Sequence, residues 1–92
     1  MADVVITLKI MPVSPDVDLK SIEKEALEKI KSFSGMENYK VETEPVAFGL
    51  KAVKILFVMD EAKGATDPLE EELGRIKGVN SVEVTDVRRA IG

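Results

Sequence analysis

The sequence predicts a small α+β protein in which four antiparallel strands form one sheet and two helices cover one face of it. Its 92 residues fit a single domain over residues 1–92, and a hydrophobic content of 45% can form a core without disulfide bonds. Segments in which every second residue is apolar, typical of half-buried strands, alternate with segments in which apolar residues recur every three or four positions, typical of helices. The segments follow one another in the order βαββαβ.

The first strand is expected at residues 4–11, where apolar and polar residues alternate, and Pro12 and Pro15 are expected to interrupt regular pairing. A helix is expected at residues 18–33, because its apolar residues form one stripe. Two residues can cap its N-terminus by accepting bonds from free amides, namely Ser14 and Asp18. Gly35 can end it in the left-handed conformation.

A hairpin is expected in the middle of the chain. Residues 39–44 alternate and precede Pro45, which suits an edge strand. Residues 52–59 form the most apolar run and are rich in β-favouring side chains, which suits a central strand. Residues 46–51 connect the two strands.

The last third of the chain repeats the helix–strand pattern. Residues 67–77 predict a second helix with Asp67 as its cap and Gly78 as its end. Residues 81–87 predict the last strand, and residues 88–92 a short tail.

Two right-handed β-α-β crossovers joined by a hairpin give the ferredoxin-like arrangement. The face of the sheet without helices would carry a mixed set of residues: Val5, Thr7, Lys9, Met11, Lys54, Leu56 and Val58. This face is either a contact surface or ordinary exposed apolar area, and the second is more common in soluble proteins.

The composition excludes most familiar active sites. Without Cys or His the chain has no thiolate, no imidazole base and no zinc site of the usual kind. Glycines form no phosphate-binding motif, and Glu70–Glu72 is better explained by the dipole of the second helix than by a metal site. We therefore expect no covalent catalysis, no cofactor and no metal.

Charge and hydropathy limit the partners. A formal net charge of −4 argues against a general nucleic-acid-binding surface. RNA-recognition modules of this topology stack bases on paired aromatics of the two central strands, but here Phe57 is the only aromatic expected on them. No apolar run reaches the roughly 20 residues that cross a bilayer, and the N-terminus is not a cationic signal region. A cytoplasmic protein without direct nucleic-acid or membrane contacts is expected.

Phe48 beside Gly49 and close to Lys51 is the most unusual local feature. An exposed aromatic on a hairpin turn can anchor a partner, and a nearby cation can steer it. Alternatively, the ring folds back and closes the end of the core, and the sequence pattern alone favours neither arrangement. Arg88 and Arg89 form a second candidate binding element, with a solvated, frayed tail as the more common alternative.

Four segments resemble the archaeal translation elongation factor 1-beta family, and together they extend over nearly the whole chain: Met11-Pro12, Asp18-Leu19, residues 45–51 and residues 82–89. The most specific is Pro-Val-Ala-Phe-Gly-Leu-Lys at 45–51, which matches in residue type, order and position between the second and third strands. The resemblance implies the ferredoxin-like fold and a guanine-nucleotide exchange factor for the GTPase elongation factor 1-alpha.

The resemblance also implies site residues. Phe48 corresponds to the aromatic that is presented to the GTPase, Gly49 permits the turn, and Lys51 lies alongside. Eukaryotic members end in a basic residue that reaches the magnesium and phosphate site. In this chain the last residues, 90–92, contain no cation. Arg88 and Arg89 lie nearby and could replace the charge of that residue, but they do not occupy its position in the sequence. The chain corresponds to the catalytic domain without the long N-terminal extension of eukaryotic forms, and a monomer is expected.

Two rival functions share the predicted topology. A small-molecule-binding regulatory domain of the ACT type would use the semi-apolar sheet face and form ligand-dependent dimers. An acylphosphatase-like hydrolase would need an arginine in the loop after the first strand, but residues 12–18 contain no cation.

Overall fold

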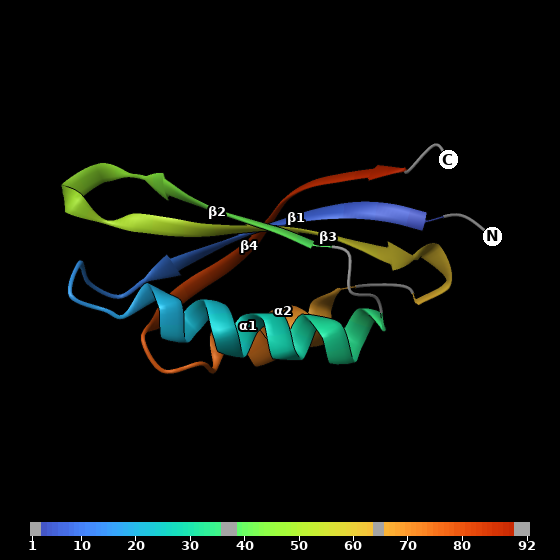
Figure 1. Ribbon diagram of the computed structural model, residues 1–92, viewed down its shortest axis with the longest axis horizontal. Coiled ribbons are helices and arrows are strands. Elements are labelled where there is room, and N and C mark those ends of the chain that lie inside the picture. Colours follow the sequence, from blue (N-terminus) through green and yellow to red (C-terminus); the bar gives the residue numbers. More distant parts are fainter. Residues whose placement is uncertain (1–2, 36–38, 64–65, 90–92) are drawn as a thin grey trace.

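In the computed structural model, residues 3–35, 39–63 and 66–89 are described. Four antiparallel strands form one sheet in the order β2-β3-β1-β4: β1 (Asp3–Pro12), β2 (Tyr39–Pro45), β3 (Lys51–Asp60) and β4 (Val79–Arg89). The helices α1 (Leu19–Ser34) and α2 (Asp67–Gly74) lie on one side of the sheet (Figure 1). The predicted βαββαβ ferredoxin-like α+β fold is confirmed, with β1 and β3 in the centre and β2 at an edge.

The core lies between the helices and the sheet. Alternate residues of β1 and β3 face the helices, as the strand periodicity requires. The fully buried large side chains of this layer are Leu8, Ile10, Ile22, Ile30, Val53, Ile55, Phe57, Met59, Leu69 and Leu73. The opposite face of the sheet is not covered by any described segment (Figure 1). We call it the open face.

Helix α1 begins and ends as the sequence predicts. Of the two possible caps, Asp18 is the one used: its carboxylate accepts bonds from the amides of Lys20 at 3.1 Å and Ser21 at 3.4 Å. Gly35 ends the helix with φ 71° and donates its N–H to the carbonyl of Lys31 at 2.8 Å. This left-handed terminator is favourable for glycine because it has no Cβ.

Helix α2 differs from the prediction at both ends. The cap residue is Thr66 instead of Asp67, and its hydroxyl donates to Glu70 Oε2 at 3.1 Å. The helix ends at Gly74, three residues earlier than predicted, because the amides of Arg75 and Ile76 bond to carbonyls only three residues back. Glycine at position 74 favours this early end. Neither α1 nor α2 is long and apolar enough to cross a membrane.

The strands follow the prediction at Pro12 but not at the ends of β4. Regular pairing of β1 ends at Pro12, as predicted: the register shifts between Met11 and Pro12, and Pro12 lies opposite Val79 as the last residue of the strand. Strand β4 begins and ends two residues beyond the predicted limits. A second register shift, between Thr7 and Leu8 of β1, disturbs the alternation along β4 and hides its true length in the sequence.

Gly78 is required by the close approach of its backbone to the loop before α1. Its φ is 94°, and a Cβ at this position would lie 2.7 Å from Cγ1 of Val17. We expect Gly78→Ala to lower the free energy of unfolding by about 1–2 kcal/mol, because the left-handed strain and the contact both oppose the methyl group. Thermal unfolding followed by circular dichroism measures this loss. Gly74→Ala is the control: no heavy atom lies within 4 Å of its added Cβ, and alanine favours the helix. An unchanged melting temperature for Gly78→Ala would contradict this packing argument.

Candidate functional site

The β2–β3 hairpin ends in a tight turn built from residues of the predicted site. The amide of Leu50 donates to the carbonyl of Ala47 at 3.3 Å, and the amide of Val46 donates to the carbonyl of Leu50 at 2.8 Å. The two central residues both have positive φ, 62° at Phe48 and 74° at Gly49. Positive φ at both central positions is the mark of a type I′ turn, whose twist matches that of the flanking strands.

Phe48 has an unfavourable backbone conformation, and its aromatic ring is not buried. It is the first central residue of the turn, where asparagine, aspartate or glycine is preferred, and a phenylalanine in this left-handed region costs about 1–2 kcal/mol. Its ring gains nothing in return from the fold, because the residue is 93% exposed. The ring does not close the end of the core in this structure. Strain and exposure of a large aromatic together make Phe48 a candidate for an intermolecular contact.

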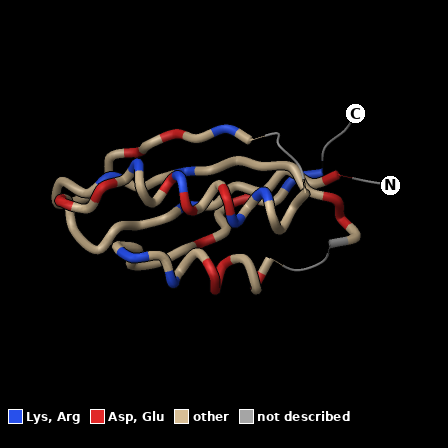
Figure 2. Tube along the Cα trace, turned by 60° about the horizontal axis from the view of Figure 1, so that its bottom comes forward, with Lys and Arg blue, Asp and Glu red and all other residues tan. Residues whose placement is uncertain are grey.

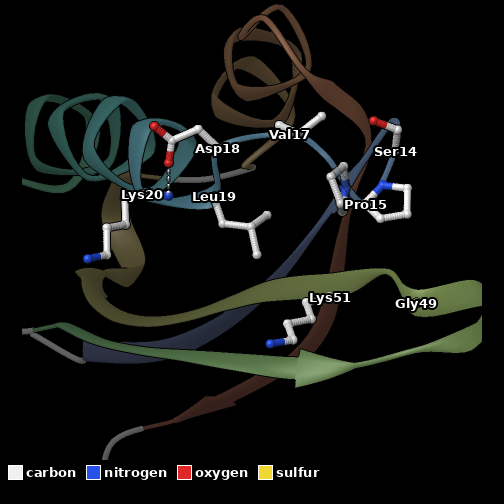
Figure 3. A pocket seen from close by; sticks show the side chains of 9 residues that line it. Ser14, Pro15, Val17, Asp18, Leu19, Lys20, Gly49 and Lys51 are labelled. Atoms are coloured by element: carbon white, nitrogen blue, oxygen red, sulfur yellow. Dashed lines mark hydrogen bonds between the residues drawn. The ribbon is translucent and has the colours of Figure 1, made fainter.

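Gly49 and Lys51 lie at the edge of a pocket beside the turn. Its volume is about 360 Å³, and it lies between the hairpin, the loop after β1 and the start of α1 (Figure 3). Leu19 points from α1 toward the hairpin strand that carries Lys51 (Figure 3). Asp18, on the opposite wall, is already engaged as the cap of α1. The lining of the pocket thus combines apolar side chains with the cations Lys20 and Lys51.

Arg88 and Arg89 are not a frayed tail. Both belong to β4, opposite Val5 and Val4 of β1 respectively. Arg88 Nε lies 2.8 Å from Asp86 Oδ2, and Arg89 Nη2 lies 2.8 Å from Glu61 Oε1. The arginine side chains are 79% and 71% exposed, so these ion pairs orient the guanidinium groups but add little stability.

The structure divides the predicted site residues into two groups. Phe48, Gly49 and Lys51 lie at the hairpin end of the long axis, whereas the two arginines lie at the end that holds the chain termini (Figures 1 and 2). Lys51 is seven residues from Val58 in β3, and Val58 is opposite Val5, the partner of Arg88. At 3.3 Å per residue the two groups are about 23 Å apart along the sheet. A single small ligand cannot contact both groups.

A second pocket, which sequence reasoning missed, lies at the arginine end. It has a volume of about 410 Å³, with Ile6 and Met59 among its apolar residues and the Arg89–Glu61 ion pair beside them. Val87, another of its residues, is 57% exposed. The strand pattern did not reveal this pocket, because the register shift in β4 changes which face Val87 occupies. Among the described residues no cluster of three acidic side chains is placed to hold a metal ion.

Comparison with known proteins decides the family. The family model described as the EF-1 guanine nucleotide exchange domain matches residues 5–90. The chain belongs to the EF-1 guanine nucleotide exchange family. This membership gives it a role as a nucleotide exchange factor in translation elongation, in agreement with the resemblance of residues 45–51.

Relatives of similar length support the EF-1 exchange family. The chain is 51% identical over 89 residues to an elongation factor 1-beta of Methanothermobacter thermautotrophicus, a match that covers 97% of this chain and 98% of the relative. It is 45% identical over 89 residues to that of Methanobrevibacter smithii, with the same coverage. It is 42% identical over 89 residues to that of Archaeoglobus fulgidus, covering 95% and 97% of the two chains.

One solved structure bears on the fold alone. A de novo designed protein, Foldit4, superimposes with a TM-score of 0.62 at 24% identity, covering 98% of each chain. The family match favours exchange over the ACT-type and acylphosphatase-like alternatives, because it extends over nearly the whole chain.

Proposed function

We propose that this protein promotes GDP release and GTP rebinding on elongation factor 1-alpha in the cytoplasm, acting as a monomer. The observation that supports this proposal best is Phe48, a strained residue in a type I′ turn with a fully presented ring. An aromatic ring on a rigid turn loses little conformational entropy when a partner pocket receives it, and such residues often dominate interface energies.

The proposed mechanism uses binding preference instead of covalent chemistry. A protein that binds the nucleotide-free GTPase more tightly than the GDP-bound form weakens GDP binding by the same factor. Each tenfold loss of GDP affinity needs about 1.4 kcal/mol of differential contact. One buried aromatic and a few charged hydrogen bonds therefore supply several powers of ten.

The two groups of site residues suggest how the exchange factor is placed on its partner. With Phe48 near one end and Arg88 near the other, a GTPase that contacts both is engaged over about 23 Å or more. In this arrangement Phe48 is the anchor, with Gly49 and Lys51 beside it. Arg88 and Arg89 exchange their intramolecular carboxylates for acceptors on the GTPase.

Release of labelled GDP tests the proposal. We expect the full chain, at catalytic amounts, to accelerate release from the matching elongation factor 1-alpha by at least tenfold in the presence of excess unlabelled GTP. An unrelated GTPase of the translation apparatus serves as the control and should be unaffected. A release rate that does not change with the concentration of the chain would refute the proposed function.

A further inference from the structure

The middle of the open face carries an uncommon row of charges. Lys9 of β1 lies directly opposite Lys54 of β3. On the outer strands, Glu83 lies opposite Lys9, and Glu42 lies opposite Lys54. Across the sheet the row therefore reads Glu42, Lys54, Lys9, Glu83, with two like charges side by side in its centre.

The two central lysines have no carboxylate partner among the described residues. No described carboxylate oxygen lies within 4.0 Å of either ammonium group. Glu42 pairs instead with Lys40 on its own strand, at 3.3 Å. Like charges directly opposite in a sheet are destabilising, and Lys9 and Lys54 are also half-buried. Where a fold retains such an unfavourable pair, a function outside folding is indicated.

Apolar residues flank the lysine pair along the strands. Toward the arginine end lie Val5, Leu56 and Val58. They border a shallow depression of about 180 Å³, whose other lining residues are Tyr39, Lys40 and Phe57. Toward the hairpin end lies Met11, two residues beyond Lys9. Along the central strands the open face thus presents an apolar depression, a pair of positive charges and a further apolar side chain.

We propose that the open face binds an amphipathic helix of a partner protein that carries a carboxylate between two apolar positions. Leu56 and Val58 are two and four residues from Lys54, which is about 7 and 13 Å along a strand. At about 1.5 Å per residue of helix, the carboxylate lies about five to nine residues from the side chain in the depression. The second apolar position follows about one helical turn later, over Met11.

A second copy of the chain centred on the lysine pair fits this face less well. Two copies could pack with their open faces together. If their two-fold axis ran parallel to the strands, between β1 and β3, Lys9 would lie against Lys54 of the other copy, and Glu42 against Glu83. A two-fold axis along the row itself places each residue against its own copy. Both arrangements oppose like charges, which disfavours association.

Single-stranded RNA fits less well too. Its bases require exposed aromatics on the central strands, but Phe57 faces the helices and is 1% exposed. The row itself contains none of the residues assigned to nucleotide exchange. Arg88 lies opposite Val5, at the far edge of the depression, so GDP release is measured separately from peptide binding.

The test uses the isotopically labelled full chain and a synthetic helical peptide with a leucine, a glutamate and a second leucine at the spacing given above. Chemical shifts of the backbone amides report where the peptide binds. We expect shifts along β1 and β3 on the open face. Replacing the peptide glutamate by glutamine should weaken binding about tenfold, because a charge-assisted contact is lost.

A matched pair of variants separates a specific contact from general attraction. Lys9→Gln/Lys54→Gln should weaken peptide binding at least tenfold and raise the melting temperature by about 3 °C, since the repulsion is removed. Lys24→Gln/Lys77→Gln makes the same change in net charge away from the open face and should leave the affinity within about twofold. The rise in melting temperature shows that the first variant is folded. GDP release by the same variants tests the exchange function separately.

Four results would overturn the proposal. They are peptide shifts outside the open face, equal weakening by both double variants, concentration-dependent shifts of the same face without peptide, and tighter binding of oligouridylate there than of the peptide. The third result would assign the face to a second copy of the chain, and the fourth to RNA.

Discussion

Replacing Phe48 by asparagine is expected to slow GDP release from elongation factor 1-alpha about thirtyfold or more and, at the same time, to stabilise the free protein. The loss corresponds to at least about 2 kcal/mol, as for other aromatic anchors at the centre of an interface. The gain arises because asparagine accepts positive φ readily at the first central position of a type I′ turn. Phe48 is 93% exposed, so no packing is lost. A stabilisation of about 1 kcal/mol raises the melting temperature of a domain of this size by roughly 4–8 °C.

Phe48→Asn should lower the exchange activity and raise the melting temperature, and general damage to the fold cannot produce both changes. Phe48→Tyr retains an aromatic ring at the same strained position and should keep most of the exchange activity without the gain in stability. If Phe48→Asn lowered the melting temperature, the ring would be part of the core in solution. If exchange stayed at the level of the unsubstituted chain, Phe48 would have no role in binding.

The behaviour of Phe48 shows where sequence reasoning reaches its limit. The alternation on both sides places the residue in a hairpin connection, and the neighbouring glycine marks a turn. The direction of the ring depends on the backbone conformation, and at the observed φ of 62° the residue is 93% exposed. This conformation is unusual for phenylalanine, so no rule based on residue preference predicts it.

The limit has a different cause in β4. Strand periodicity assumes that every residue is paired in turn, but Thr7 is opposite Asp86 and Leu8 is opposite Val84, which leaves Thr85 without a position in the register. After this irregularity the inward and outward positions change places. Arg88 and Arg89 therefore resemble a tail in the sequence although both are paired with β1.

The register between β1 and β3 also determines whether the two lysines of the open face lie side by side. The sequence correctly places Lys9 and Lys54 on one side of the sheet, because each lies among alternating residues of its own strand. It cannot show that they are directly opposite, since a shift of two residues would keep the faces and separate the charges. The pairing of β1 with β3 provides this information.

Neutralising both arginines by Arg88→Gln/Arg89→Gln is expected to slow GDP release about a hundredfold while the fold remains intact. Hydrogen bonds to charged groups contribute about 1.5–3 kcal/mol each, so two of them amount to about 3 kcal/mol or more. The ion pairs with Asp86 and Glu61 are exposed, and losing them costs the free protein little. Glutamine keeps both backbone positions of β4, whereas deleting residues 88–92 would also remove two paired residues opposite β1. Substitution is therefore a better test of the arginines than truncation.

The carboxylates that hold the arginines provide the matched control. Asp86→Asn/Glu61→Gln removes the intramolecular partners but keeps both guanidinium groups, and exchange should fall by less than about threefold. Because the arginines and Phe48 are about 23 Å or more apart and share no partner, their effects on the barrier to GDP release should add. The variant that combines Phe48→Asn with both arginine substitutions should then show the product of the two separate losses, which single-turnover release measures directly. A combined loss no larger than that of Phe48→Asn alone would mean that the arginines act only through the contact made at the hairpin, and a proposal of two separate contacts with the GTPase would be wrong.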